Sequence, residues 1–434
     1  MHMTKVSFVA TGDSFITRKV PSKTSDSFKK LSNLINSADF KFTNLETTVH
    51  NNEGYPTAFS GGTWAMSPPS VLKDLKDYGF NAMAWANNHT LDYSYGGLLS
   101  TKRYLDQEDI IHAGVGEDMA EASAPKYVDT EHSRIAMISV TSTFHESGIA
   151  GEQRPDMVGR PGVNPLRYET TFYISEDEMN AMKHIANTTK INATRNLSIK
   201  EGFIHPSDDD TLIFGNHHFK VGDENKKVTT PNKKDMERLK TKISEAQRQS
   251  DVVIVSIHAH EMAGEDKAIP AQFLEEASKG CIDAGADAII GHGPHILRGI
   301  EIYKNKPIFY SLGNFIFQND SVASLPADFY EKFNLDHSHN ISDAFDTRSS
   351  NDTKGFALNQ KFWESVVAEW EMEGDKVTKI KLHPVELGFG SRRHQRGWPS
   401  LSKDDHVLKQ LQELSEPYGT EIHIEDHVGI ISLS

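Results

Sequence analysis

The stretch Ala288-Ile289-Ile290-Gly291-His292-Gly293-Pro294-His295 joins a short apolar run to a polar turn that carries two histidines. An apolar run of this length, bounded by glycine and proline, is typical of a strand buried on both faces. The same arrangement, an apolar run followed by a polar cluster, recurs five more times along the chain. These other runs cover residues 6–10, 39–42, 80–85, 252–257 and 307–310.

Helical segments alternate with these runs. Segments 71–78, 96–107 and 270–284 carry apolar residues at helical spacing, and Gly79 and Gly285 end two of them. Strands that alternate with helices of this length predict an α/β fold with at least some parallel strands. Such sheets bind ligands beyond the carboxyl ends of their strands, where five of the six polar clusters hold residue types that bind metals.

The composition of the whole chain narrows the class of protein. Its 434 residues include 37% hydrophobic ones, enough for a sizeable core, which argues against a disordered acidic tail. The formal net charge of −15 argues against a general nucleic-acid-binding protein. No stretch approaches the roughly 18 apolar residues of a membrane span, and the single cysteine, Cys281, cannot form an internal disulfide. We therefore expect a cytoplasmic protein.

We expect a single domain over residues 1–434 with two interruptions. Residues from about 167 to 234 are polar around a helix-like run and a strand pair that turns at Gly215-Asn216, which indicates an insertion. Residues from about 319 to 355 lack periodicity and predict a long mobile loop. Residues from about 362 to 434 return to strand-like alternation with one helix, which predicts a C-terminal α/β extension.

The polar clusters supply a mixed set of oxygen and imidazole ligands: Asp13, Glu46, Asn88, His258, His292 and His295. Carboxylate and amide oxygens suit harder divalent ions, whereas imidazoles suit Mn, Fe or Zn. A carboxylate can also bridge two ions about 3.5–4 Å apart, as hydrolytic two-metal sites require. One Gly-Asp or Asn-His pair alone is usually turn chemistry, but its repetition at strand ends predicts one or two divalent metal ions.

A second set of residues is expected near these ligands, as substrate-binding or supporting groups: Asp92, Arg160, His260, Glu261, Arg298 and Asn314. Arg160, between glycines and a proline, is either a bidentate partner of a carboxylate or phosphate or an ordinary surface arginine. Asp92 either orients His89 or caps the next helix, and the sequence slightly favours the cap. For Glu261 the sequence leaves three roles open: a metal ligand, a supporting group next to the ligands, or an ordinary surface residue.

Longer strings around these residues resemble a known family. Residues 86–93 read Ala-Asn-Asn-His-Thr-Leu-Asp-Tyr, and residues 290–295 and 307–315 resemble a second signature. With Gly12-Asp13, Asn44-Leu45-Glu46 and residues 159–163, these strings resemble the poly-γ-glutamate capsule-biosynthesis protein (CapA) family. That family is itself similar to calcineurin-like metallophosphoesterases. The resemblance covers about residues 7–317, with a weaker echo in 384–419, and implies a four-layer α/β/β/α sandwich of the metallo-dependent phosphatase type.

The resemblance also implies roles for individual residues. It assigns Asp13 and His295 to one metal, Asn88, His258 and His292 to a second, and the bridging position to Glu46. His89 corresponds to a histidine that can protonate a leaving group. Phe15 stands where the calcineurin-like pattern has a histidine, which leaves the first metal short of a ligand. His260 either replaces that ligand or shapes specificity.

Three functions remain open on the sequence. The leading one is a hydrolase in which a metal-activated water attacks a phosphoester or a γ-glutamyl-type amide with His89 as the acid. Poly-γ-glutamate itself comes only from the resemblance. The second is a non-catalytic accessory protein that binds polyglutamate or a capsule-synthesis complex, and the third is a metal-dependent amide-forming or group-transfer enzyme on a small acid. The leading reading expects an anionic small-molecule or polyglutamate-like substrate. The net charge of −15 does not oppose this, because divalent ions and Arg160 can make one pocket locally positive.

Overall fold

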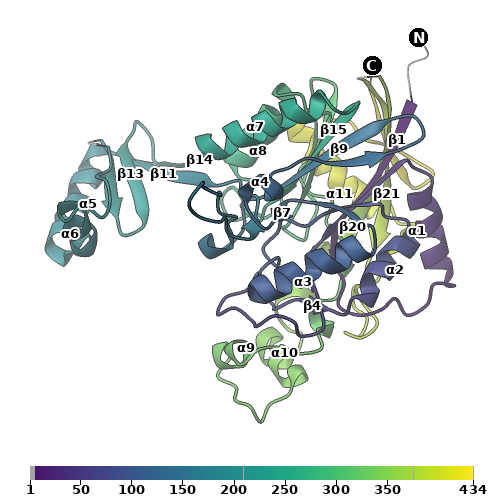
Figure 1. Cartoon of the computed structure of the whole chain (residues 1–434), viewed down its shortest axis with the longest axis horizontal. Coiled ribbons are helices and arrows are strands. Elements are labelled where there is room, and N and C mark those ends of the chain that lie inside the picture. The colour runs from purple at the N-terminus through teal and green to yellow at the C-terminus, as the bar shows by residue number, and fades with distance from the viewer. Residues whose placement is uncertain (1–4, 209, 375, 434) are drawn as a thin grey trace.

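The computed structural model describes residues 5–208, 210–374 and 376–433. Two large sheets run through the main body, and a smaller sheet with two helices projects from it on the left of Figure 1. The expected α/β class is confirmed, because helices alternate with strands and several neighbouring strands are parallel. Among the described residues, no helix has both the length and the apolar character needed to cross a membrane.

The first large sheet is built around β1 (Lys5–Phe15). This strand pairs in parallel with β2 (Phe40–Leu45) and β19 (Asn314–Phe317), and antiparallel with β20 (Glu364–Glu373). The other strands of this sheet are β5 (Ala82–Ala84), β6 (Ile111–Ala113), β21 (Lys376–Glu386), β22 (Ser400–Leu401), β23 (His423–Glu425) and β24 (Val428–Ser432). Their order is β23-β24-β21-β20-β1-β2-β5-β6, with β19 beside β1 and β22 beside β21.

The second large sheet has β15 (Val252–His258) and β16 (Ala288–His292) near its centre, paired in parallel. Its other strands are β8 (Lys126–Asp129), β9 (Arg134–Thr141), β17 (Ile300–Tyr303) and β18 (Lys306–Phe309). The order is β17-β18-β16-β15-β9-β8. Every residue of β15 is buried, as its continuous apolar sequence predicts for a strand covered on both faces.

Alternating residues of the strands belong to different parts of the core. Phe8 and Phe42 of the first sheet belong to the same apolar cluster as Ile254 and Ile290 of the second, so the two sheets face each other. Val9, the neighbour of Phe8, belongs to a different cluster, as a two-residue period requires.

Helices cover the other faces of both sheets. Leu31, Leu72 and Leu98, from α1 (Asp26–Asn36), α2 (Ser70–Tyr78) and α3 (Ser94–Gln107), belong to the cluster that includes Val9. Leu239 and Phe273, from α7 (Lys233–Gln247) and α8 (Gln272–Asp283), cluster with residues of β15. The helices expected over 71–78, 96–107 and 270–284 are therefore confirmed to within about two residues at each end.

Residues 168–231 form the projecting part of the molecule in Figure 1. A small sheet in the order β12-β13-β11-β14 carries two helices. Its elements are β11 (Tyr168–Ile174), α5 (Glu176–Thr189), α6 (Ala193–Lys200), β12 (Leu212–Phe214), β13 (His217–Val221) and β14 (Lys226–Pro231). The strand pair turns at Gly215, whose φ is +60°, and this confirms the turn expected from Gly215-Asn216.

The expectation of a long mobile loop over residues 319–355 is wrong. Instead of a long loop these residues contain α9 (Ala327–Lys332) and α10 (Ile341–Ser349), and Phe329 and Phe345 of these helices are buried in a cluster with Trp64 and Trp363. Both helices have fewer than three turns, which is too short for a helical period to appear in the sequence.

The C-terminal residues complete the first sheet. β20 pairs with β1 from Glu373 to Ala368, and β21 pairs with β20 along its length. Leu408 and Leu411 of α11 (His406–Ser415) belong to the cluster between the two sheets. The short remaining elements are β3 (Thr48–Val49), β4 (Met66–Ser67), β7 (Val115–Gly116), α4 (Met119–Ala122) and β10 (Gly162–Val163).

Candidate metal centre

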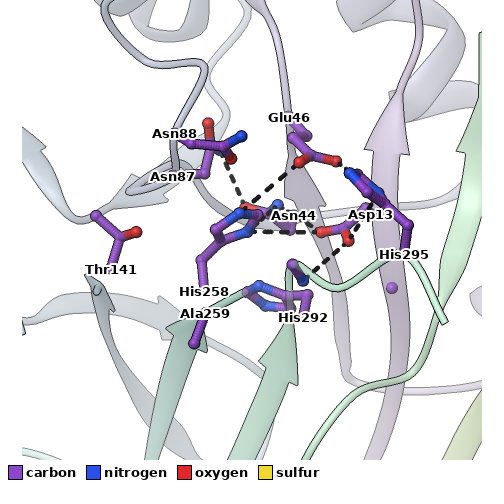
Figure 2. A network of polar contacts seen from close by, with 12 residues as sticks. Asp13, Asn44, Glu46, Asn87, Asn88, Thr141, His258, Ala259, His292 and His295 are labelled. Atoms are coloured by element: carbon purple, nitrogen blue, oxygen red, sulfur yellow. Dashed lines mark hydrogen bonds and ion pairs between the residues drawn. The ribbon is translucent and has the colours of Figure 1, made fainter. Parts of the chain in front are cut away.

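The predicted ligands meet where strands of the two large sheets end (Figure 2). β15 and β16 end at His258 and His292, which are direct partners in the parallel register. Glu46 directly follows β2. Asp13 lies inside β1, because this strand continues to Phe15 beyond the apolar run that predicted it. The parallel topology therefore brings together residues that are more than 200 positions apart in the sequence.

Six side chains form two groups of possible metal ligands. Each group has its ligand atoms within 4.8 Å of one another. The groups are Asp13 with His258 and His292, and Glu46 with His260 and His295. This division differs from the one that the resemblance implied, because His295 is grouped with Glu46 rather than with Asp13. His260, considered on the sequence as a replacement ligand or a specificity residue, belongs to the second group, with its Nε2 3.2 Å from His258 Nε2.

Carboxylates and imidazoles face one another at distances longer than hydrogen bonds. His258 lies with Nδ1 3.8 Å from Asp13 Oδ1 and with Nε2 3.7 Å from Glu46 Oε1. His295 Nδ1 lies 3.9 Å from Asp13 Oδ2 and 3.7 Å from Glu46 Oε2 (Figure 2). Two ligand atoms that each lie about 2.1 Å from one ion are roughly 3–3.5 Å apart. The observed separations of 3.7–3.9 Å are longer than a hydrogen bond and slightly longer than this value, so these side chains would have to move a few tenths of an ångström closer around a shared ion.

Several buried polar atoms at this centre have no hydrogen-bond partner among the described residues. They include both carboxylate oxygens of Glu46, Oδ1 of Asn88 and Nδ1 of His292. The opposite ends of the last two side chains are engaged, since Asn88 Nδ2 donates to the Gly61 carbonyl and His292 Nε2 contacts Ser256 Oγ. Buried polar atoms are rarely left unpartnered, so their chemistry fits a bound divalent cation.

Burial dominates the electrostatics of the centre. It raises the pKa of Asp13 to about 7 and the pKa of Glu46 well above its usual value, with the charge of Asp13 adding to the second shift. Burial also lowers the pKa of His292 and of His295 to about 3, and that of His258 well below its usual value. The imidazoles are therefore neutral at pH 7 and able to ligate, whereas the carboxylates must lose protons to bind a cation.

Three neighbours fix the positions of the ligands. Asn44 Nδ2 donates to Asp13 Oδ1 at 2.7 Å, and the Gly293 amide donates to Asp13 Oδ2 at 3.1 Å. Gly293 has φ of +119°, and a Cβ there would lie within 3 Å of the Ala259 backbone, so this turn requires glycine. Asn314 Oδ1 contacts His295 Nδ1 at 2.9 Å, and His295 itself adopts a left-handed φ of +62°. Such strain in a non-glycine residue is typical of functional sites.

The segment after β15 is held by Arg298. This side chain is only 1% exposed, and it donates to the carbonyls of Glu261 and Lys267 at 2.8 and 2.9 Å. Glu261 in turn accepts hydrogen bonds from the hydroxyls of Ser142 and Thr143. Arg298 and Glu261 therefore support the backbone around His260 rather than contact a ligand directly.

His89 and Asp92 form a buried pair next to the ligands. His89 Nδ1 lies 2.6 Å from Asp92 Oδ2, and Asp92 also accepts hydrogen bonds from the amides of Gly61 and Ala65. Tyr93, not Asp92, precedes α3, so the slight preference for a helix cap was wrong. With Nδ1 engaged, Nε2 is the His89 nitrogen available for proton transfer.

Arg160 has no contact with the ligands in this structure. Its side chain is exposed, and its Nε donates to the carbonyl of Ile149 at 3.0 Å. The same structure adds residues that sequence reasoning did not select. Asn44 and Asn87 are such residues, and Asn87 Oδ1 accepts the His89 amide while its Nδ2 lies 3.3 Å from Asn44 Oδ1. Their signal in the sequence was position: Asn44 lies two residues before Glu46, and Asn87 directly precedes Asn88.

A cavity of about 290 Å³ opens beside Asn88. Asn87, Asn88 and Asp92 line one part of it, and Phe59 and His145, whose rings stack at 3.6 Å, line another. The cavity therefore brings a small ligand next to the candidate ligand Asn88 and the His89–Asp92 pair.

Comparisons with known proteins show which family the chain is similar to. The sequence model of the family described as "Bacterial capsule synthesis protein PGA_cap" matches residues 7–319. The uncharacterized protein y4sH of Sinorhizobium fredii is 36% identical over 98% of this chain and 92% of its own length. The capsule biosynthesis protein CapA of Bacillus anthracis is 26% identical over 57% of this chain and 42% of its own length. The PGA biosynthesis protein CapA of Bacillus subtilis is 24% identical, over 70% and 60% respectively.

Proposed function

The chain belongs to the bacterial capsule synthesis protein family PGA_cap, and from this premise we propose that it is a metal-dependent hydrolase of poly-γ-glutamate metabolism. The bond it cleaves is a γ-glutamyl-type amide or a phosphoester in an anionic substrate. The matched relative from Bacillus subtilis is named a PGA biosynthesis protein, and this name supports poly-γ-glutamate as the substrate class.

The observation that carries the proposal is Glu46. This carboxylate is fully buried, has no hydrogen-bond partner among the described residues, and lies within 3.7 Å of nitrogens from both His258 and His295. Burying such a group without compensation is costly, and a shared cation compensates it. The two ligand groups around it support a centre of one or two Mn, Fe or Zn ions.

The fold supports the same proposal. Two sheets that share one apolar cluster, each covered by helices on its other face, support our proposal of a four-layer α/β/β/α sandwich of the metallophosphatase type. In that arrangement the ligands lie at the carboxyl ends of parallel strands, where α/β proteins bind their substrates.

A bound divalent ion would supply Lewis-acid activation of water and of the scissile group at this centre. The chain's own residues supply the rest of the chemistry. Asp92 fixes the His89 ring through the 2.6 Å contact at Nδ1, so that Nε2 can hold and donate a proton to a leaving group. The cavity that Asn88 and Asp92 line is the place where the substrate would bind and be oriented beside this pair.

Turnover assays with chosen substrates test this proposal. The purified chain is loaded with Mn²⁺, Fe²⁺ or Zn²⁺ and assayed on a γ-glutamyl oligomer and on p-nitrophenyl phosphate. We expect hydrolysis of one of them, lost on chelation and in Glu46→Gln and His292→Ala. His218→Ala, an exposed histidine of β13, is the matched control and keeps full activity.

The outcomes separate the alternative functions. Hydrolysis of the oligomer alone assigns amide chemistry, and hydrolysis of the aryl phosphate alone assigns phosphoester chemistry. Absence of both, with saturable oligomer binding that survives His89→Ala, contradicts the hydrolase and leaves an accessory binding protein.

A further inference from the structure

A second cavity, of about 210 Å³, lies among α10, Lys267 and the turns η3 (Gly355–Ala357) and η4 (Gln360–Trp363). We call it the cationic cavity, because five basic side chains line it: Lys267, Arg348, Lys354, Arg393 and Arg396. Only two carboxylates, Asp320 and Asp352, line it as well. A positively charged hollow is unexpected in a protein with a net charge of −15.

The cationic cavity adjoins the candidate metal centre. The ring of Phe356, which lines the cavity, lies 6.4 Å from the ring of His295, centroid to centroid. On the other side, Arg298 donates to the carbonyl of Lys267 and to that of Glu261. One aromatic ring and one buried arginine therefore connect the cavity to both His295 and the segment that carries His260.

Two of the arginines are already neutralised. Arg396 pairs with Asp320, and Arg393 pairs with Asp346 at 2.7 Å and with Asp352 at 2.8 Å. Both carboxylates of the lining are thus engaged by Arg393 and Arg396. These pairs build the wall of the cavity, and they leave the other cations without an acidic partner.

Three cations of the lining remain, Arg348, Lys267 and the exposed Lys354. None of them forms an ion pair with a carboxylate in the part of the chain that the structure describes. Arg348 donates only to neutral acceptors, Thr63 Oγ1 at 2.7 Å and Asn319 Oδ1 at 3.1 Å, and its guanidinium carbon lies 5.4 Å from the Phe356 ring. Burial lowers the pKa of Arg348, and the charge of Asp320 offsets only part of this shift, so an anion bound beside Arg348 would stabilise its charged form.

We propose that the cationic cavity is a subsite for an oxyanion of the substrate, a carboxylate or a phosphate, bound by Arg348 and Lys267. The proposal rests on the proposed function in taking the neighbouring centre as the place of reaction. A γ-glutamyl chain carries a free carboxylate on every residue, so a residue next to the scissile bond can place its carboxylate here. A substrate without a second anionic group would bind more weakly.

Equilibrium binding to the full chain tests the subsite independently of turnover. Inorganic phosphate, a γ-glutamyl trimer and neutral glutaramide are titrated by calorimetry into the chelator-treated protein, whose fold is checked by circular dichroism. We expect the trimer or phosphate, but not glutaramide, to bind and to weaken with added salt. Arg348→Gln lowers the affinity about tenfold or more, and Lys267→Met about threefold. Lys332→Met, an exposed lysine of α9 outside the cavity, leaves it unchanged.

Each outcome decides the proposal. If Arg348→Gln does not fold, Lys267→Met carries the test. Anions that do not bind, or that bind equally well to the folded Arg348 and Lys267 variants, overturn the subsite even if the enzyme is active. Anion binding that depends on Lys267 and Arg348 supports the subsite even if neither substrate is hydrolysed, and the preferred anion then identifies carboxylate or phosphate as its ligand.

Discussion

Glu46 illustrates, at the scale of one side chain, how burial and charge act together. Its pKa is raised well above the usual value by burial and by the neighbouring charge of Asp13. Burial therefore favours the protonated form of Glu46 in the metal-free chain, whereas a bound cation would favour the anion. A single buried carboxylate thus couples metal binding to proton release.

The Glu46→Gln variant separates ligation from folding. Because the raised pKa favours the protonated side chain, which glutamine resembles in shape and charge, we expect the free energy of unfolding under chelation to change by less than about 1 kcal/mol. Metal affinity should fall by about a hundredfold or more, since a lost supporting contact alone typically has effects of up to that size. Urea unfolding and metal titration measure the two quantities. Equal metal affinity in variant and parent would refute the role of Glu46.

The His89–Asp92 pair is tested by the choice of leaving group. His89→Ala should lower kcat by roughly 10²–10⁴ on a substrate with a poorly acidic leaving group, because that group needs a proton. The loss should be much smaller with p-nitrophenolate, which leaves unprotonated. Asp92→Asn should show the same selectivity more weakly, with KM little changed. An equal loss on both substrates would mean that His89 has a structural role.

At the scale of elements, the segment after β15 depends on one buried arginine. Burial lowers the pKa of Arg298 to about 10, yet the side chain stays charged at pH 7 and binds backbone carbonyls on both sides of the segment. We expect Arg298→Met to lower the free energy of unfolding by about 3 kcal/mol or more, because several carbonyls lose their partner. Metal affinity should fall as well, since His260 lies in this segment.

Arg298→Lys provides the matched variant, because it keeps the charge but cannot reach all of the carbonyls. It should fall between the parent and Arg298→Met in both urea unfolding and metal titration. Parent-like unfolding and metal affinity in Arg298→Met would show that the segment holds its shape without this residue.

The sequence predicted helices and strands correctly where an apolar run or a helical spacing was visible within one continuous segment. β15 and β16, buried on both faces, and α3, with its helical spacing, lie close to the expected ranges. The short helices α9 and α10 were not predicted, because the burial of Phe329 and Phe345 depends on contacts with tryptophans that are distant in the sequence.

The candidate site was also predicted only where the local sequence pattern was sufficient. His258 and His292 follow apolar runs and were found as strand-end residues, whereas the contact of Asn44 with Asp13 depends on the register of β1 and β2. The orientation of Asp92 toward His89 also depends on tertiary contacts, because the local pattern slightly favours a helix cap.

At the scale of the whole molecule, the buried centre makes stability depend on pH and metal together. Asp13 has a folded pKa of about 7, raised from 3.8, so its contribution to stability is lost as pH rises through about 7. His292 and His295 have folded pKa values of about 3, lowered from 6.5, so their contribution is lost as pH falls below 6.5. The two effects oppose each other between these limits.

Above about pH 7.5 the imidazoles of the centre are neutral in both the folded and the unfolded chain, so only the carboxylates with raised pKa still contribute to the pH dependence, and the window from about pH 7.5 to 8.5 gives a clear prediction. The Tm of the chelated protein should fall with rising pH, while the metal-loaded protein keeps its Tm, so the difference grows. Asp13→Asn should flatten the pH dependence of the chelated protein. Differential scanning calorimetry at several pH values measures this, and a difference that shrinks with rising pH would contradict the assigned shifts.

Metal content is the most direct test of the central claim that these residues form a metal centre. Inductively coupled plasma mass spectrometry on dialysed parent protein and Glu46→Gln, with His218→Ala as control, gives the number of bound ions per chain. The account predicts one or two ions of Mn, Fe or Zn in the parent and in the control, and a clear loss in Glu46→Gln. A parent protein that binds none of these ions when they are supplied, or a Glu46→Gln variant that binds as many as the parent, would contradict it.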